Sequence, residues 1–413
     1  CSKIKAHQVS YHGEKKILTP VETENKITMD DVIAGRASLD DLVSQLTADE
    51  MIQLCVGTAR GFGEQTIVGA ASANVPGAAG DTTSIMLEDR NIRNMILADG
   101  PAGLRLTPEF KTTADGQLLQ TGMVFGDLKT GGADEIPEDA VTYYQYCTAI
   151  PIGTALAQSW DEELIEAVGS IVGEEMEQFH VHLWLAPAMN IHRNPLCGRN
   201  FEYYSEDPLV AGICAAADTK GVQSHCGVGT TIKHFAANSQ EDDRYFTNAH
   251  VGERAIREIY LKGFEIAIKT SQPMSIMSSY NLLNGVHTAN SYDLLTAVAR
   301  DEWGFAGLVM TDWFTTQDMS FIAGNVSHFK YGKSSPAMCI KAGNDLIMPG
   351  GQSDLDGILA ALDAKEGESI TLGDLQACAK NILNIIMKSS CYEGSKPYGE
   401  HFENMEWAVK VEK

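Results

Sequence analysis

The run GFAGLVMTDW ends in an aspartate and a tryptophan, which are the first candidates for chemistry in this chain. A parallel strand buried on both faces is apolar along its length and presents polar groups at its C-terminal end. Asp312 in that position could act as a carboxylate nucleophile, and Trp313 could support the apolar face of a sugar ring. The alternatives are a helix-capping role for Asp312 and core packing for Trp313.

Lys233 and His234 follow the apolar residues TTI, so at least one of them points inward if this segment is a strand. A buried lysine is costly unless it is paired, which favours a functional role over a structural ion pair. Both cations, together with nearby arginines, would lower the pKa of Asp312. Arg244 lies on the loop that follows this strand.

Residues 187–208 combine two arginines, three aromatic residues and a Glu-Asp pair. Arginine and carboxylate side chains can each bind two hydroxyl groups, so this density favours a neutral, hydroxyl-rich ligand.

A catalytic metal is not expected. Asp99, His234 and Asp312 could bind a divalent cation, but Lys233 and the arginines would repel it. We therefore predict no metal and no cofactor.

These residues follow apolar runs that alternate with amphipathic segments, as in parallel strands joined by helices. We predict a TIM-type (β/α)8-like barrel in preference to a doubly wound sheet. In such a barrel the C-terminal ends of the strands, and the polar residues on them, meet at one end of the barrel. No GxGxxG or Walker sequence indicates a nucleotide. The predicted strands are NMILAD, PIGTALAQ, VHLWLAPAMN, GTTIKHF, PMSIMSS, AGLVMTD and AGNDLIMP.

The composition indicates a globular protein: 413 residues, 44% hydrophobic and 21% charged. A net charge of -24 argues against nucleic acid and anionic membranes as partners. No apolar stretch approaches the roughly 20 residues that span a bilayer. The nine cysteines are scattered without metal-site spacing, which indicates reduced thiols and a cytoplasmic location.

We predict three regions: a lead-in or interdomain linker over 1–38, a barrel over 39–390 and a C-terminal tail over 391–413. Within the barrel, the glycine-rich and alanine-rich stretch 57–84 is expected to be a long loop.

Six ordered motifs resemble the catalytic barrel of glycoside hydrolase family 3, the group of retaining β-glucosidases. They are ADGPAGLRL, GTALAQSWD, NPLCGRNFEYYSEDP, KHFAANSQEDDR, SSYNLLNG and GLVMTDW, and the resemblance runs from about Leu39 to Met387. It implies that Asp312 is the nucleophile that forms a covalent glycosyl-enzyme on a terminal β-D-glucosyl residue. The implied substrate-binding residues are Asp99, Arg105, Arg199, Lys233, His234, Arg244, Met277, Tyr280 and Trp313.

The resemblance also implies a general acid/base glutamate on an α/β sandwich domain, which we do not expect within these 413 residues. The sequence begins at Cys1 and is similar to the second half of a circularly permuted member. We therefore expect the glutamate to come from a preceding segment or a second chain. A β-xylosidase, a non-catalytic sugar-binding or scaffold barrel, and a metal-dependent barrel hydrolase or aldolase stay open as alternatives.

Overall fold

The computed structural model describes residues 13, 15–57, 75–83, 85–119, 123–125, 128–130, 135–245, 247–317 and 331–402. Most of the loop expected over 57–84 lies outside these residues.

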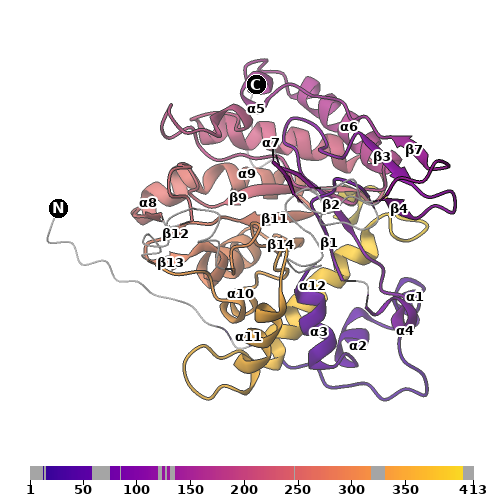
Figure 1. The fold of residues 1–413 in the computed structure, drawn as a ribbon. Coiled ribbons are helices and arrows are strands. Elements are labelled where there is room, and N and C mark those ends of the chain that lie inside the picture. Colours follow the sequence, from indigo (N-terminus) through magenta and orange to yellow (C-terminus); the bar gives the residue numbers. More distant parts are fainter. Residues whose placement is uncertain are drawn as a thin grey trace, which may run out of the picture.

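The centre of the fold is a curled sheet of six strands in the order β1-β2-β8-β9-β11-β14 (Figure 1). β1 is antiparallel to β2, and every other pair is parallel. The bounds are Gly80–Asp81 for β1, Ile96–Ala98 for β2, Leu183–Trp184 for β8, Gly229–Phe235 for β9, Ser275–Ser278 for β11 and Leu308–Met310 for β14.

Isolated β-bridges extend the sheet past β14. Met310 bridges to Leu346, and Ile347 bridges to Val56, both in the parallel sense. A Cβ atom at the neighbouring Gly57 would lie 3.3 Å from the carbonyl oxygen of Asp81 in β1. The sheet thus returns to its first strand, which confirms the predicted TIM-like barrel.

One predicted strand is wrong, because PIGTALAQ contains helix α5 (Gly153–Ala157). The Thr154 hydroxyl donates to the carbonyl oxygens of Asn200 and Tyr203, at 2.8 and 2.9 Å. These contacts fix α5 against the loop that follows β8. A short apolar run does not distinguish helix from strand, so tertiary contacts decided the outcome here.

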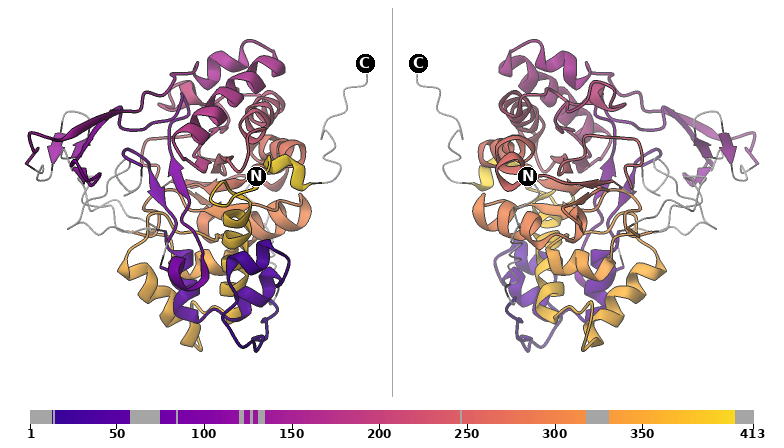
Figure 2. Two further views of the ribbon diagram at one scale, coloured as in Figure 1. Left: turned by 90° about the vertical axis from the view of Figure 1, so that its right-hand side faces the viewer. Right: turned by 90° about the vertical axis from the view of Figure 1, so that its left-hand side faces the viewer.

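A second, antiparallel sheet was not predicted. It has the order β4-β3-β7 and lies in the chain between β2 and α5. Figure 2 shows it standing away from the barrel. The bounds are Glu109–Thr112 for β3, Leu118–Leu119 for β4 and Val141–Tyr144 for β7, with a hairpin of β5 (Met123–Phe125) and β6 (Leu128–Thr130) between β4 and β7. A third small sheet joins β10 (Asn248–Ala249), β12 (Leu282–Leu283) and β13 (Val286–His287).

Helices pack on the outside of the strands, as the alternating pattern predicted (Figure 1). The contact of α6 with α7 depends on glycine, because a Cβ atom at Gly221 would lie 2.0 Å from the carbonyl oxygen of Glu166. The bounds are Met29–Ile33 for α1, Leu39–Ser44 for α2, Ala48–Cys55 for α3, Leu87–Arg90 for α4, Glu162–Gln178 for α6, Pro208–Gln223 for α7, Glu253–Ala255 for α8, Lys262–Ser271 for α9, Pro336–Ala342 for α10, Gln352–Asp363 for α11 and Leu372–Lys388 for α12. Ile256–Tyr260 and Asp293–Glu302 are π-helical, and Asn200–Glu202, Thr288–Asn290 and Tyr398–His401 are 3₁₀ turns.

The core divides between the two faces of the sheet. Leu97, Leu183 and Leu308 belong to one buried cluster, which also contains residues of α3 and α12. Their neighbours Trp184 and Val309 belong to the other cluster, which packs against α6, α7 and α9. Successive residues of a strand point to opposite faces of the sheet. Because both faces are buried, the strands are apolar along their whole length, as the sequence indicated.

Both ends of the described chain pack on the barrel. In the expected lead-in, Ile27 and Met29 are buried, and the Leu18 N–H donates to the side chain of Gln376 at 2.8 Å. In the expected tail, Tyr392 and Tyr398 are buried. The domain boundaries themselves stay a prediction.

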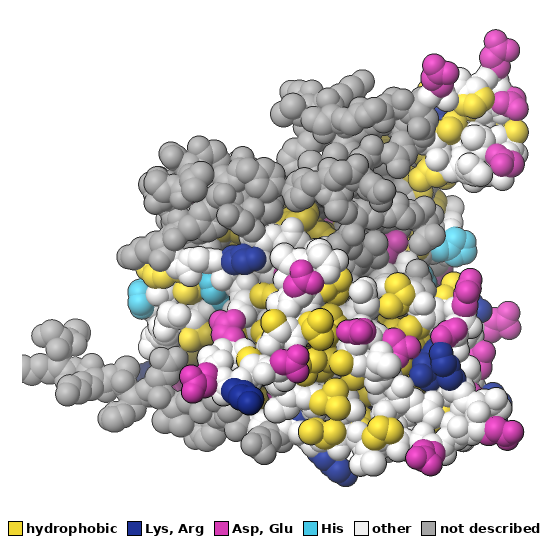
Figure 3. Space-filling view, turned by 60° about the horizontal axis from the view of Figure 1, so that its bottom comes forward, with side chains coloured by type: hydrophobic (Ala, Val, Ile, Leu, Met, Phe, Trp, Pro, Cys, Tyr) yellow, Lys and Arg dark blue, Asp and Glu magenta, His cyan; other side chains and the backbone are white. Residues whose placement is uncertain are grey.

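The excess of acidic over basic residues in the sequence is seen on the surface. Asp and Glu side chains are spread over the described part of the face in Figure 3. Within the described ranges, no helix is both long and apolar enough to cross a bilayer. All eight cysteines in the described ranges are free thiols.

Candidate active site

The ends of β2 and β9 bring Asp99 together with Lys233. The Lys233 ammonium donates to Asp99 Oδ1 at 2.8 Å, and Arg105 pairs with the other carboxylate oxygen. Burial raises the pKa of Asp99, but the charges of Lys233 and Arg105 outweigh it and bring the pKa down to about 2. The buried lysine is therefore paired, and Asp99 is an ionised acceptor at neutral pH.

Asp312 follows β14 and is buried. Its Oδ1 accepts a 2.7 Å hydrogen bond from the Trp313 N–H. Its Oδ2 is also buried, and within the described part of the chain it has no hydrogen-bond partner. The nearest cationic or imidazole nitrogen within 4 Å is Nε2 of His234, at 3.8 Å. This oxygen is thus left free to react.

Burial raises the pKa of Asp312, and the positive charges of Arg244, Arg199 and Lys233 offset only part of that rise. The sequence led us to expect a lowered pKa, which is wrong in direction. Charge pairs can be inferred from residue types, whereas the desolvation of one carboxyl group depends on the folded surroundings.

His234 is held in place by Asn190. The His234 backbone N–H donates to Asn190 Oδ1 at 2.8 Å, and Asn190 Nδ2 donates to the His234 carbonyl at 2.8 Å. Ring Nδ1 lies 3.2 Å from the same Oδ1, so Nδ1 carries the proton. Burial and the charges of nearby cations place the pKa of His234 well below its usual value. The ring is neutral and directs an unprotonated Nε2 toward Asp312.

Two arginines, on the loops after β8 and β9, are close enough to Asp312 for their charges to lower its pKa. Arg199 pairs with the buried Glu202. Arg244 pairs with Glu241 at 3.0 Å, and its guanidinium lies 4.9 Å from the ring centroid of Tyr280. Sequence reasoning missed both glutamates, because an acidic residue on a loop carries no signal until its arginine partner is known.

Tyr280 and Trp313 are joined by a 2.9 Å hydrogen bond from the Tyr280 hydroxyl to the Trp313 carbonyl. The Trp313 indole N–H donates to the Ala79 carbonyl at 3.0 Å, and the side chain is buried in the core cluster. Trp313 thus has the core packing that its alternative interpretation expected, whereas the Asp312 side chain accepts from the next residue and the described residues up to Gln317 form no helix for it to cap. Met277 of β11 is buried beside Met310 of β14.

The described residues contain no group of three or more His, Cys, Asp or Glu side chains that could hold a metal ion. The site instead places Lys233, Arg199 and Arg244, each paired with another carboxylate, around Asp312. Such an arrangement can hold the hydroxyl groups of a sugar and direct the carboxylate at its anomeric carbon.

Comparison with known proteins identifies the family. Residues 133–385 match the model of the glycosyl hydrolase family 3 N-terminal domain. The chain belongs to this family. A β-glucosidase of Ruminococcus albus is 35% identical over 376 residues, which are 90% of this chain and 34% of the relative. An exo-α-(1→6)-L-arabinopyranosidase of Bifidobacterium longum is 38% identical over 303 residues, which are 73% of this chain and 34% of the relative.

A solved structure supports the same assignment. β-Glucosidase 3B from Thermotoga neapolitana in complex with glucose superposes with a TM-score of 0.67 at 40% identity, over 88% of this chain and 45% of that one. The family 3 barrel predicted from six motifs is therefore confirmed. This chain spans about a third of the length of the Ruminococcus and Bifidobacterium relatives.

Proposed function

We propose that this chain carries the nucleophile and the sugar-binding residues of a retaining, exo-acting β-glucosidase. The observation that carries the proposal is the buried Oδ2 of Asp312, which has no hydrogen-bond partner among the described residues, with Arg199, Arg244 and Lys233 close enough to act on its charge. Its β-glucosidase relatives support the same reaction class.

In the first step, Asp312 Oδ2 attacks the anomeric carbon of a terminal glucosyl unit. The bond from that carbon to the leaving-group oxygen breaks, and a proton supplied by an acid completes the leaving alcohol. In the second step, water attacks the same carbon, the acid now acts as a base, and the Asp312 carboxylate is released. Positive charge develops on the sugar ring in the transition state of each step. Hydrogen bonds to the ring hydroxyls that strengthen in the transition state therefore lower the barrier.

Asp99 and Lys233 are proposed to bind the hydroxyl groups farthest from the scissile bond. Their mutual ion pair fixes both groups before the substrate arrives, so little ordering is needed on binding. Arg199, Arg244 and neutral His234 are proposed to bind the hydroxyls nearer Asp312. The general acid/base is proposed to be a glutamate outside this chain.

The test is the kinetics of Asp312→Ala, with Asp301→Ala as the matched control, because Asp301 is exposed on the π-helix Asp293–Glu302. We expect turnover of 2,4-dinitrophenyl β-D-glucopyranoside to fall by about 10³-fold or more in Asp312→Ala and to be unchanged in the control. This leaving group needs no protonation, so the first step does not depend on the acid/base, and kcat/KM, which reports the steps up to the first irreversible one, is the value compared. Full activity in Asp312→Ala would refute the proposal.

An arabinopyranoside is a second candidate substrate, because an exo-α-(1→6)-L-arabinopyranosidase is among the relatives. Comparing kcat/KM for the 4-nitrophenyl α-L-arabinopyranoside, β-D-xyloside and β-D-glucoside decides between the candidates. We expect the glucoside to give the highest value.

A further inference from the structure

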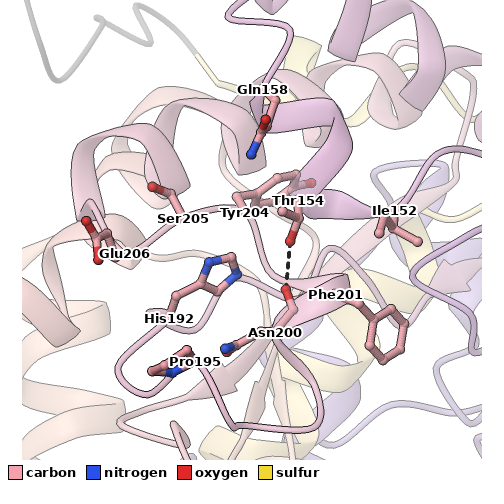
Figure 4. Close-up of a pocket in the computed structure, with 10 residues that line it drawn as sticks. All are labelled: Ile152, Thr154, Gln158, His192, Pro195, Asn200, Phe201, Tyr204, Ser205 and Glu206. Atoms are coloured by element: carbon pink, nitrogen blue, oxygen red, sulfur yellow. Dashed lines mark hydrogen bonds between the residues drawn. The ribbon is translucent and has the colours of Figure 1, made fainter.

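A separate pocket of about 610 Å³ lies between α5 and the loop after β8 (Figure 4). Thr154 and Gln158 line it on one side, and His192, Asn200 and Phe201 line it on the other. None of its lining residues belongs to the group around Asp312. The Tyr203 ring lies between the two sites, with centroid distances of 6.5 Å to His192 and 6.3 Å to His234.

Two of the residues that line this pocket each carry a buried polar atom without a hydrogen-bond partner among the described residues. These atoms are His192 Nε2 and Asn200 Oδ1. Asn200 Nδ2 is already committed to the Asn194 carbonyl at 2.8 Å. An unsatisfied buried polar atom is destabilising, so a ligand hydroxyl that bonds either atom would gain affinity.

The chemical character of the residues that line the pocket indicates which class of ligand it would bind. Among the described residues that line the pocket there is no lysine or arginine and Glu206 is the one carboxylate, so an anion such as a phosphate ester would be repelled. Thr154, Gln158 and Ser205 add hydroxyl and amide groups. The ring of Phe201, half exposed, offers an apolar surface at the rim. Neutral polar groups beside an aromatic face suit a polyhydroxylated ring.

We propose that this pocket is a second carbohydrate site, which binds a neutral hexose or the end of an oligosaccharide apart from the catalytic centre. The lining chemistry carries this proposal, and only the choice of glucose as the first probe rests on the proposed function.

The experiment is isothermal titration of the full chain with glucose. Asp99→Ala removes the ion-paired acceptor of the catalytic centre and weakens binding there, so the part of the persisting binding that depends on Phe201 reports the second pocket. Phe201→Ala, added to Asp99→Ala, removes the apolar rim. Leu196→Ala is the matched control, because this exposed apolar residue lies on the same loop but does not line the pocket.

We expect saturable binding to persist in Asp99→Ala, to weaken by about tenfold or more in Asp99→Ala/Phe201→Ala, and to be unchanged in Asp99→Ala/Leu196→Ala. Absence of binding in Asp99→Ala, or binding that does not respond to Phe201→Ala, would overturn the second site. Phe201-dependent binding in a chain that releases no dinitrophenol from 2,4-dinitrophenyl β-D-glucopyranoside would support the pocket and contradict the proposed function, so the two failures are distinguishable.

Discussion

At Asp312, burial and charge act in opposite directions on one carboxyl group. Burial raises its pKa, and Arg244, Arg199 and Lys233 oppose the rise. Glu241 shares Arg244, and burial raises its pKa too. Because the two carboxylates interact, removing the charge of Glu241 should stabilise the ionised form of Asp312. Glu241 is therefore a positioning residue, whose role is to orient Arg244 and to tune Asp312.

We predict that Glu241→Gln shifts the acid limb of kcat/KM to lower pH, because the nucleophile must be ionised and its pKa falls. The same change lowers kcat/KM on the plateau by about tenfold, since Arg244 loses a charged partner. The measurement is a pH profile with 2,4-dinitrophenyl glucoside. Glu258→Gln is the control, because Glu258 pairs with Arg254 at the same 3.0 Å but on the surface. An acid limb that stays in place or moves to higher pH would contradict the role of Glu241.

At the scale of elements, helix packing sets the barrel. α6 and α7 approach closely because Gly221 has no side chain: a Cβ atom there would lie 2.0 Å from the backbone of Glu166. We predict that Gly221→Ala lowers the free energy of unfolding by about 1–3 kcal/mol, despite the better helix propensity of alanine. The control is Gly198→Ala, whose Cβ would meet nothing within 4 Å. Denaturant titration measures both, and an unchanged midpoint for Gly221→Ala would show that the helices can separate without cost.

An element could be predicted where the residues that determine it are neighbours in the sequence. The start of helix α3 follows a local pattern, because Thr47 and Glu50, three residues apart, form a capping box at its first turn. Strands β9 and β14 were visible because uniform burial makes them apolar along their length. α5 was not, since its contacts to Asn200 and Tyr203 are distant in sequence. The ion pairs Arg199–Glu202 and Arg244–Glu241 join residues three apart in the sequence, but on an irregular loop this spacing alone does not show that the two side chains meet.

For the whole molecule, stability depends on pH through a buried carboxyl group distant in the chain from Asp312. Burial raises the pKa of Asp218 to about 7, and the Tyr204 hydroxyl donates to its Oδ2 at 2.7 Å. Between pH 4 and 7 the folded chain binds a proton here that the unfolded chain has released. This contribution to stability is therefore present at acidic pH and is lost as pH rises through about 7.

We predict that Asp218→Asn gains stability relative to the parent chain as pH rises from about 4 to 8, because the amide keeps the Tyr204 hydrogen bond and never ionises. The expected difference between the thermal midpoints grows by several degrees across this range. Differential scanning calorimetry at four pH values measures it. A difference that is constant with pH would mean that Asp218 does not titrate differently on folding.

The central claim is that Asp312 forms a bond to a sugar, and trapping that bond tests it most directly. The chain is incubated with 2,4-dinitrophenyl 2-deoxy-2-fluoro-β-D-glucopyranoside, whose leaving group departs without an acid and whose fluorine slows the release of the sugar by water. Mass spectrometry of the intact chain and of its peptides then locates the label. We predict one fluoroglucosyl group on the peptide that contains Asp312 and none in Asp312→Ala. A label on another residue, or dinitrophenol release without any label, would contradict the account.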